Sequence, residues 1–234
     1  MKKRQRLGQH FLISQSVAKS IVSAADITKN DVVLEIGTGK GILIPLLCKK
    51  AKKVISIESD KELFQTAKAK FSHIPNLILK HGDGFKTGNS FSIFVSNLPY
   101  SQSRKAIEWL IQKKFSRGIV MVQKEFAEKL FQKGKKRKSI SVLANYAAYI
   151  EKIMDVKKTN FVPIPKVDSS ILKLTWKKTV SKVLIRNVNT LFSYRRKTLQ
   201  NILKQVGKHL ESGKRIDEFT GEEIIKFAKQ INQK

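Results

Sequence analysis

The chain has 234 residues, 41% of them hydrophobic, which is enough for one large core or for one core with a small appendage. Its net charge of +29, from 47 Lys and Arg residues against 18 Asp and Glu, favours RNA or DNA as a partner over an acidic membrane surface. The composition argues against a membrane span, a secretory signal, an internal disulfide (Cys48 is the single cysteine) and a metal site, and it fits a cytoplasmic protein.

The first half of the chain alternates apolar runs with amphipathic segments. After a basic N-terminal arm, apolar residues between 17 and 25 recur at helical spacing. Beyond them, β-branched runs predict buried strands and helical patterns separate these strands. The expected order is strand 32–36, helix 42–50, strand 54–57, helix 60–71, strand 77–79 and strand 92–96.

The second half changes character near residue 177. Before it we expect helix 104–114, strand 118–122, helix 124–132, helix 139–148, and strands 149–157 and 170–176 joined by a loop over 161–168. After it only helical patterns remain, at 183–192, 197–206 and 222–231. Strand–helix alternation predicts an α/β fold with a doubly wound, mostly parallel, Rossmann-like sheet. We expect that domain over 1–177 and a small all-helical domain over 178–234.

A glycine-rich turn follows the first predicted strand. Residues 35–41 read Glu-Ile-Gly-Thr-Gly-Lys-Gly, so Gly37, Gly39 and Gly41 lie where the backbone can pass close to a ligand. The dinucleotide fingerprint requires a glycine at the position of Ile42, and no phosphate-binding Gly-Lys-Ser/Thr is present. The turn therefore favours a nucleoside ligand without phosphate, of which S-adenosylmethionine is the common one.

Polar side chains follow the next three strands at their carboxyl ends. Glu58 ends the second strand, where an acid binds a ribose diol. Asp83 follows the third, where a carboxylate can accept from the adenine amino group of the donor. Each acid alone is equally well explained as a helix cap or a solvated charge. With Asn97 after the fourth strand, the set predicts a methyl-donor site at one edge of the sheet.

The segment Asn97-Leu98-Pro99-Tyr100 is suited to hold an adenine amino group. Adenine N6 is a poor nucleophile because its lone pair is delocalised into the ring, so its N–H groups need acceptors that turn the lone pair toward the methyl. The Asn97 side-chain oxygen and a main-chain carbonyl, assigned to Leu98, fit this role. Pro99 fixes the backbone, and Tyr100 offers a stacking face for an extruded base. The plain alternative is an ordinary turn.

Taken together, these motifs resemble the small-subunit rRNA adenine N6,N6-dimethyltransferase family over nearly the whole chain. The matching stretches fall in the same order and spacing: Gly8–Leu12, Glu35–Gly41, Glu58, Asp83, Asn97–Tyr100, Gln123–Glu128, Phe161–Ser169 and Arg195–Asn201. Many relatives have asparagine where this chain has His10.

The resemblance implies a class I S-adenosylmethionine-dependent methyltransferase fold without a metal. It places His10 and Leu12 in the donor-binding motif, Asn97 beside the donor, and Phe161 as an aromatic that sandwiches the target base. It implies that two adjacent adenines, in a hairpin loop near the 3′ end of small-subunit rRNA, each receive two methyl groups, with S-adenosylhomocysteine as the product. The partner would be an assembling 30S-type particle in ribosome biogenesis, and the protein a monomer. A C-terminal domain of about 55 residues suggests the compact archaeal type.

Two basic runs are candidates for RNA contacts. We expect them to hold phosphates, against the alternative that they form a solvated face of a lysine-rich protein: Lys135, Lys136, Arg137, Lys138, Arg195, Arg196 and Lys197.

Three rival functions share parts of this pattern. A large-subunit dimethyltransferase of the macrolide-resistance type has the same donor site, but the Phe161–Ser169 and Arg195–Asn201 stretches favour the small-subunit type. A mitochondrial-type transcription factor on this fold would be a binding module, against which the intact Asn97 segment argues. DNA adenine methyltransferases usually carry proline directly after the Asn or Asp, where this chain has Leu98.

Overall fold

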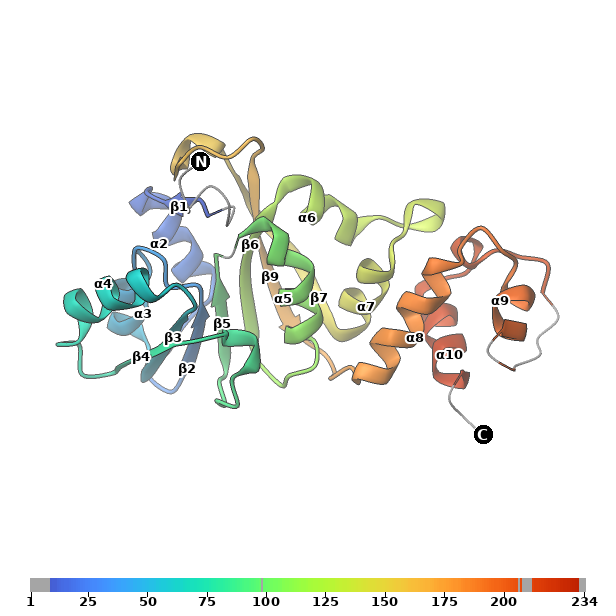
Figure 1. Cartoon of the computed structure of the whole chain (residues 1–234), viewed down its shortest axis with the longest axis horizontal. Helices are drawn as coiled ribbons and strands as arrows, with labels where there is room; N and C mark the ends of the chain where they lie inside the picture. The colour runs from blue at the N-terminus through green and yellow to red at the C-terminus, as the bar shows by residue number, and fades with distance from the viewer. Residues whose placement is uncertain (1–8, 98, 206, 208–211, 232–234) are drawn as a thin grey trace. The chain divides into compact units, whose positions relative to one another are not determined.

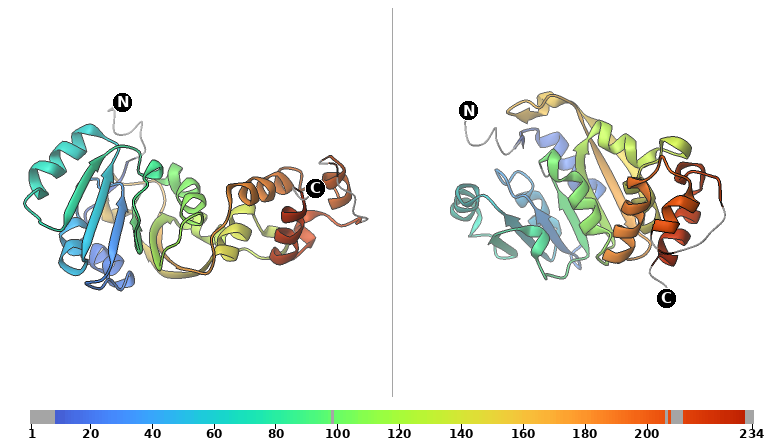
Figure 2. Two further views of the ribbon diagram at one scale, coloured as in Figure 1. Left: turned by 90° about the horizontal axis from the view of Figure 1, so that it is seen from below. Right: turned by 45° about the vertical axis from the view of Figure 1, so that its right-hand side comes forward.

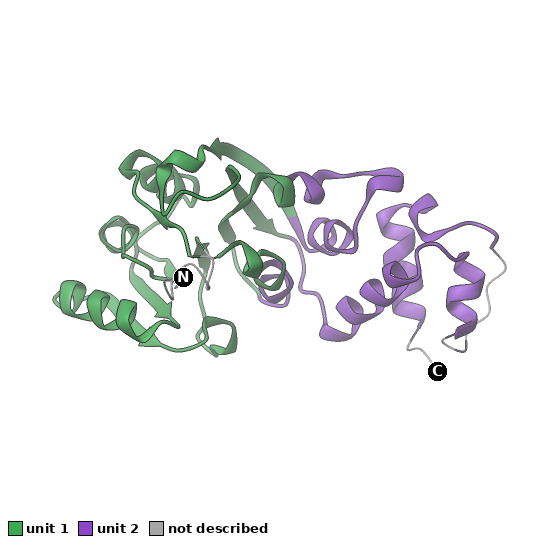
Figure 3. Ribbon diagram, turned by 45° about the horizontal axis from the view of Figure 1, so that its top comes forward, with its two compact units in different colours: residues 1–106, 114–127, 149–176 green, residues 107–113, 128–148, 177–234 purple. Residues whose placement is uncertain are grey.

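The computed structural model describes residues 9–97, 99–205, 207 and 212–231. The chain forms two compact units (Figure 3). Unit 1 comprises residues 1–106, 114–127 and 149–176, and unit 2 comprises residues 107–113, 128–148 and 177–234. Two segments from the middle of the chain thus join the C-terminal part in unit 2. The division into domains 1–177 and 178–234 stays a prediction.

A seven-stranded sheet forms the frame of the first unit (Figure 1). Its strand order is β4-β3-β2-β5-β6-β9-β7; β2 to β6 are parallel neighbours, and β9 runs antiparallel to β6. The strands are β2 (Val32–Ile36), β3 (Lys53–Glu58), β4 (Leu77–His81), β5 (Ile93–Ser96), β6 (Arg117–Gln123), β7 (Ala148–Val156) and β9 (Ser169–Trp176). The predicted mostly parallel sheet is confirmed. The order reverses between β2 and β5, and ligands bind at such a switch point.

Helices α2 (Gln15–Ala24), α3 (Ile44–Lys50) and α4 (Lys61–Phe71) share one hydrophobic core with the sheet (Figure 2). Alternate strand residues point to that face, among them Val33, Val54 and Ile93, each fully buried. Two of these helices, α2 and α4, begin where a side chain satisfies free backbone N–H groups. The carboxylate of Asp60 accepts from the N–H groups of Glu62 and Leu63 at the start of α4.

A two-stranded ribbon that the sequence did not reveal lies beside the sheet. Strand β1 (Phe11–Leu12) pairs antiparallel with β8 (Phe161–Val162), so the predicted loop over 161–168 begins as a strand. Each strand has only two residues, and residues 13–160 lie between them, so neither periodicity nor a hairpin turn signals the pairing. The ribbon brings the N-terminal motif to the segment that follows the 3-10 turn η4 (Lys158–Asn160).

Six further helices and four further 3-10 turns of the described residues are connected by loops. They are α5 (Ser103–Leu110), α6 (Lys124–Phe131), α7 (Ser139–Ala147), α8 (Lys182–Ser193), α9 (Leu199–Gln205) and α10 (Gly221–Gln230), with 3-10 turns η1 (Gly84–Lys86), η2 (Tyr100–Gln102), η3 (Gly134–Lys136) and η5 (Ile216–Glu218). The described residues after 177 contain helices and 3-10 turns and no strand, as predicted.

Replacing Gly41 with alanine will destabilise unit 1 by about 2–4 kcal/mol, from backbone strain together with overpacking. Gly41 has φ +74°, and a Cβ there would overlap the ring of Phe71 at the end of α4. Urea unfolding measures the loss. Gly88→Ala is the matched control, because nothing lies within 4 Å of a Cβ at that position. Equal stability of the two variants would contradict this role of Gly41.

Candidate active site

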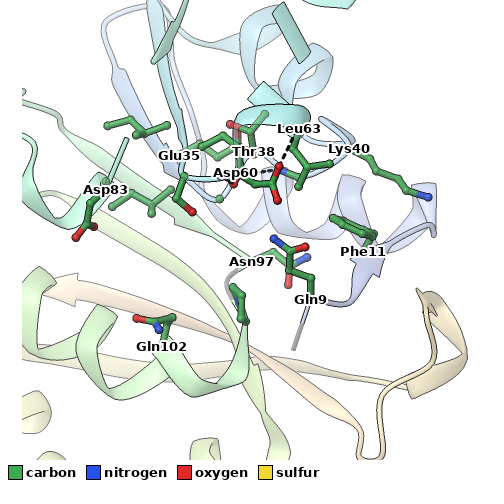
Figure 4. A pocket seen from close by; sticks show the side chains of 18 of the residues that line it. Gln9, Phe11, Glu35, Thr38, Lys40, Asp60, Leu63, Asp83, Asn97 and Gln102 are labelled. Carbon is green, nitrogen blue, oxygen red and sulfur yellow. Dashed lines mark hydrogen bonds between the residues drawn. The ribbon is translucent and has the colours of Figure 1, made fainter. Parts of the chain in front are cut away.

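A cavity of about 710 Å³ opens in the first unit at the carboxyl ends of its parallel strands (Figure 4). It is a size typical of small-molecule sites. Its lining includes most of the residues that the sequence predicted for the donor and acceptor: His10, Leu12, Gly37, Gly39, Glu58, Asp83, Asn97 and Pro99. Gly41, Tyr100 and Phe161 are not part of the lining, and Leu98 lies outside the described residues.

Glu58 is held rigidly at the tip of β3. Its side chain is 4% exposed; one carboxylate oxygen accepts from the Gly39 N–H (2.8 Å) and the other from the Asp60 N–H (2.9 Å). The first bond ties the glycine turn to β3, and the second ties β3 to the start of α4. A carboxylate has about four acceptor positions, so the remaining ones can accept two hydroxyl groups of a ribose.

Behind Glu58 lies a buried polar network. The Ser56 hydroxyl donates to Glu35, which is 1% exposed, and the hydroxyls of Thr38 and Ser56 are 2.6 Å apart. Burial raises the pKa of Glu35 to about 8, the Ser56 hydrogen bond opposes the shift, and the Glu58 charge adds to it. This role of Glu35 does not follow from the sequence alone. The signal available was an acid inside an apolar strand.

The raised pKa of Glu35 predicts a pH-dependent stability. Between pH 4.5 and about 8 the folded chain keeps a proton on Glu35 that the unfolded chain releases, so this group's contribution to stability falls as pH rises. Glu35→Gln removes that contribution. The free energy of unfolding of the variant minus that of the wild type should therefore increase from pH 5 to pH 8, by at most roughly 1.4 kcal/mol per pH unit.

Urea unfolding at both pH values measures this difference. Glu62→Gln, the same replacement at an exposed position in the first turn of α4, serves as the control. A Glu35→Gln difference that is the same at pH 5 and pH 8 would show that Glu35 is already ionised in the folded chain.

Asp83 lies at the edge of the cavity after β4. Its carboxylate accepts from the Phe85 N–H (2.9 Å) at the start of η1, and it lies 3.5 Å from the Lys105 ammonium. It is thus the helix cap that the sequence left open as an alternative. It also lines the cavity, and its second carboxylate oxygen, the one that faces Lys105, has a further lone pair that can accept from a ligand amino group.

The acceptor segment, as we call residues 97–100, follows β5. Asn97 and Pro99 line the cavity, whereas Tyr100 lies behind its wall: the Tyr100 hydroxyl is 2.7 Å from the Ser169 hydroxyl, and burial raises its pKa. The His10 ring stacks on Tyr100 with centroids 5.7 Å apart. His10 Nδ1 lies 2.8 Å from the Pro163 carbonyl oxygen. His10 therefore links the N-terminal motif, the acceptor segment and the loop after β8.

Phe161 does not reach the cavity. It is 1% exposed and lies in the core, because it stands opposite Leu12 in the β1–β8 ribbon and opposite residues of an antiparallel pair point to the same face. Phe11 and Val162 form the next pair, and Phe11 lines the cavity. The ring of Phe161, which the family resemblance assigns to sandwich the target base, is thus buried in this structure. The role of Phe161 that the structure supports is to anchor β1.

The predicted basic runs lie in unit 2. Lys135 and Lys136 are exposed on η3, and residues 195–197 are exposed after α8, whereas Arg137 is half-buried and donates to the Phe219 carbonyl. The sequence missed Lys214 and Arg215: the Leu199 N–H donates to the Lys214 carbonyl (2.8 Å), and Thr198 bridges to Arg215. These two exposed cations extend the segment 195–197.

Comparison with known proteins decides the family. The family model described as ribosomal RNA adenine dimethylase matches residues 1–227. The chain belongs to the ribosomal RNA adenine dimethylase family.

Relatives in this family come from both bacteria and archaea. The chain is 37% identical to ribosomal RNA small subunit methyltransferase A of Thermotoga petrophila, covering 97% of this chain and 91% of the relative. It is 36% identical to the probable ribosomal RNA small subunit methyltransferase A of Pyrococcus abyssi, covering 86% and 75%. The predicted resemblance to small-subunit rRNA dimethyltransferases, and the prediction of a methyltransferase, are confirmed.

Solved structures of family-like proteins share the fold. A dimethyladenosine transferase from Plasmodium falciparum superimposes with a TM-score of 0.82 at 27% identity, covering 95% of this chain and 98% of the other. The 23S rRNA methyltransferase ErmE gives a TM-score of 0.69 at 22% identity, covering 95% and 100%, which shows a common fold alone. The predicted class I methyltransferase fold is confirmed.

Metal sites and membrane-spanning helices are both missing from the part of the chain that the structure describes. Within that part, no group of three or more His, Cys, Asp or Glu side chains is placed to hold a metal ion. Among the same residues, no helix of this family member has the length and apolarity to cross a membrane.

Proposed function

We propose that this protein transfers methyl groups from S-adenosylmethionine to N6 of two adjacent adenines in a hairpin loop near the 3′ end of small-subunit rRNA. It acts as a monomer on an assembling 30S-type particle in the cytoplasm. The observation that carries the proposal is one cavity that gathers Glu58, Asp83 and Asn97 from the tips of β3, β4 and β5, in a chain that the family model matches over residues 1–227.

The cavity fits the donor in size and in chemistry. Glu58 offers acceptors for a ribose, Asp83 an acceptor for the adenine amino group, and the Gly37–Gly39 turn leaves room for the methionine portion. Gln9 Oε1 is buried at the cavity wall with no hydrogen-bond partner among the described residues. A buried acceptor of this kind costs free energy until it is paired, and a ligand ammonium group pairs it.

The acceptor residues position the target. Bound S-adenosylmethionine supplies an electrophilic methyl group. The Asn97 side-chain oxygen accepts an N–H of the adenine amino group, which turns the nitrogen lone pair toward that methyl, and Pro99 keeps the segment rigid. Tyr100 supports the base through the His10 ring, which does line the cavity. We also propose that the main-chain carbonyl of Leu98 accepts an N–H of the adenine amino group, as the sequence predicts.

A transfer assay tests the proposed substrate. The protein and labelled donor are incubated in three separate reactions. One contains small-subunit particles lacking the modification, one the isolated 3′ hairpin, and one large subunits. We expect label in the small-subunit particles. Label confined to the large subunits would favour the macrolide-resistance type of activity instead. Label in the isolated hairpin as well as in the small-subunit particles would show that the particle is not needed.

The exposed cations of unit 2 predict the salt dependence of RNA binding. Replacing Lys135, Lys136, Arg195, Arg196 and Lys197 together with alanine should reduce the slope of log K against log salt concentration by up to roughly 4, at 0.7–0.9 for each lost phosphate contact. Arg137 is left in place because it holds the Phe219 carbonyl. Filter binding across a salt series measures the slope.

The control for this prediction neutralises the same number of exposed lysines in unit 1, at Lys19, Lys49, Lys50, Lys52 and Lys68. If that control lowers the slope as much as the unit 2 variant does, the RNA contacts are spread over the lysine-rich surface rather than gathered on the predicted runs.

A further inference from the structure

An apolar rim stands beside the acceptor segment. We define it as Ile13, Val162, Ile164 and Val167, which are 49%, 45%, 61% and 42% exposed. They belong to the β1–β8 ribbon and the stretches that directly follow its two strands. Three of the four lie between positions 162 and 167, and the pairing of β1 with β8 brings Ile13 to the same ribbon. Exposed apolar patches commonly mark interaction sites.

The pairing of β1 with β8 places part of this rim next to Phe11, a residue of the cavity wall. Phe11 and Val162 are directly opposite one another, so both point to the face away from the core. Phe11 lines the cavity. The Ile13 N–H donates to the Asn160 carbonyl (2.9 Å), which continues the pairing by one residue and places Ile13 two positions after Phe11 on the same face.

A second connection joins the rim to the target position. Pro163 lies between Val162 and Ile164, and its carbonyl oxygen is 2.8 Å from His10 Nδ1. The same His10 ring stacks on the ring of Tyr100. His10 therefore connects the backbone between Val162 and Ile164 to the Tyr100 ring.

We propose that the apolar rim binds the base adjacent to the target adenine. The inference rests on the proposed function, in which one base is extruded into the cavity. Extrusion unstacks the target from its neighbour, and the uncovered face of that neighbour is flat and apolar. Side chains without charge suit such a face and cannot hold a phosphate. Exposed Lys166, between Ile164 and Val167, supplies the cation for the phosphate of the same nucleotide.

The test is a cycle between protein and RNA. Small subunits are assembled with rRNA whose 3′ hairpin is introduced by ligation, with one adenine of the pair intact and the other either natural or abasic. The protein is the wild type or a Val162→Ser/Ile164→Ser double variant. Both side chains are largely exposed, so the variant should fold, and calorimetry should show unchanged affinity for S-adenosylmethionine.

We expect the abasic neighbour and the double variant each to lower kcat/KM by about tenfold, the range found for one lost base-stacking contact. Combined, they should lower it by no more than either alone, because both remove the same contact. The measurements are made with the abasic site at each of the two adenine positions in turn. Losses that multiply in both positions, or a double variant as active as the wild type, would overturn the proposal.

Ile153→Ser is the matched control, since Ile153 is also an exposed apolar residue of unit 1 (38%) but lies on β7. It should behave as the wild type on both RNAs. A wild-type protein that fails to methylate even the natural RNA would contradict the proposed function itself, and that result is distinct from any failure of the rim.

Discussion

Asn97→Ala will lower the rate of methyl transfer by about 10²–10³-fold, the usual cost of removing one oriented polar group from an active site. The Asn97 side chain lines the cavity after β5, and in our account its oxygen alone among side chains orients the adenine amino group. The ribose and adenine of the donor depend on Glu58 and Asp83 instead. Affinity for S-adenosylmethionine should therefore change by less than about fivefold. The corresponding loss of binding free energy is smaller than the contribution of one neutral hydrogen bond.

Single-turnover transfer to small subunits and calorimetry with the donor measure the two effects separately. Gln102→Ala is the control, because Gln102 is another amide on the wall of the same cavity, at the end of η2. It should transfer methyl groups nearly as fast as the wild type. Normal turnover in Asn97→Ala would remove Asn97 from the chemistry, and a large loss of donor affinity would make it a donor-binding residue instead.

Glu58→Ala will weaken binding of both S-adenosylmethionine and S-adenosylhomocysteine by about 10²-fold or more, because a charge-assisted pair of hydrogen bonds to the ribose is lost. The same change removes the acceptor of the Gly39 and Asp60 N–H groups, so the glycine turn loses its tie to β3. Glu58→Gln keeps one acceptor oxygen but places an amide NH₂ against one of those N–H groups. It should also bind the ligands poorly.

Calorimetry with both ligands measures this effect, since the ribose is common to them. A general loss of stability is controlled by Ser14→Ala, which removes the cap of α2 outside the cavity lining. Ser14→Ala should be less stable than the wild type yet bind both ligands normally. Unchanged dissociation constants in Glu58→Ala would mean that the ribose binds elsewhere.

The sheet and its strand tips were predictable because their signals are local. The β-branched run Val32–Ile36 ends at Gly37, and the acids and the amide that matter follow successive strands directly. In a parallel sheet, carboxyl ends meet at one edge, so the sequence positions of Glu58, Asp83 and Asn97 were enough to predict a common cavity. The structure brings these three residues into one lining.

The parts that the sequence missed depend on contacts between distant segments. The burial of Phe161 follows from its pairing with Leu12 in a ribbon of two-residue strands. The network of Glu35, Ser56 and Thr38 joins two strands and a turn, and nothing in the separate stretches shows that their oxygens meet. Lys214 joins the segment at 195–197 through a backbone hydrogen bond to Leu199. None of these contacts leaves a periodic pattern.

The central claim is that this cavity dimethylates adenine N6 in small-subunit rRNA. The most direct measurement is mass spectrometry of nuclease fragments of rRNA from small subunits that lack the modification, after incubation with the protein and S-adenosylmethionine. We expect N6,N6-dimethyladenosine at two adjacent positions near the 3′ end, and none with Asn97→Ala. Methyl groups on another base, at another ring atom, or equally abundant with Asn97→Ala would contradict it.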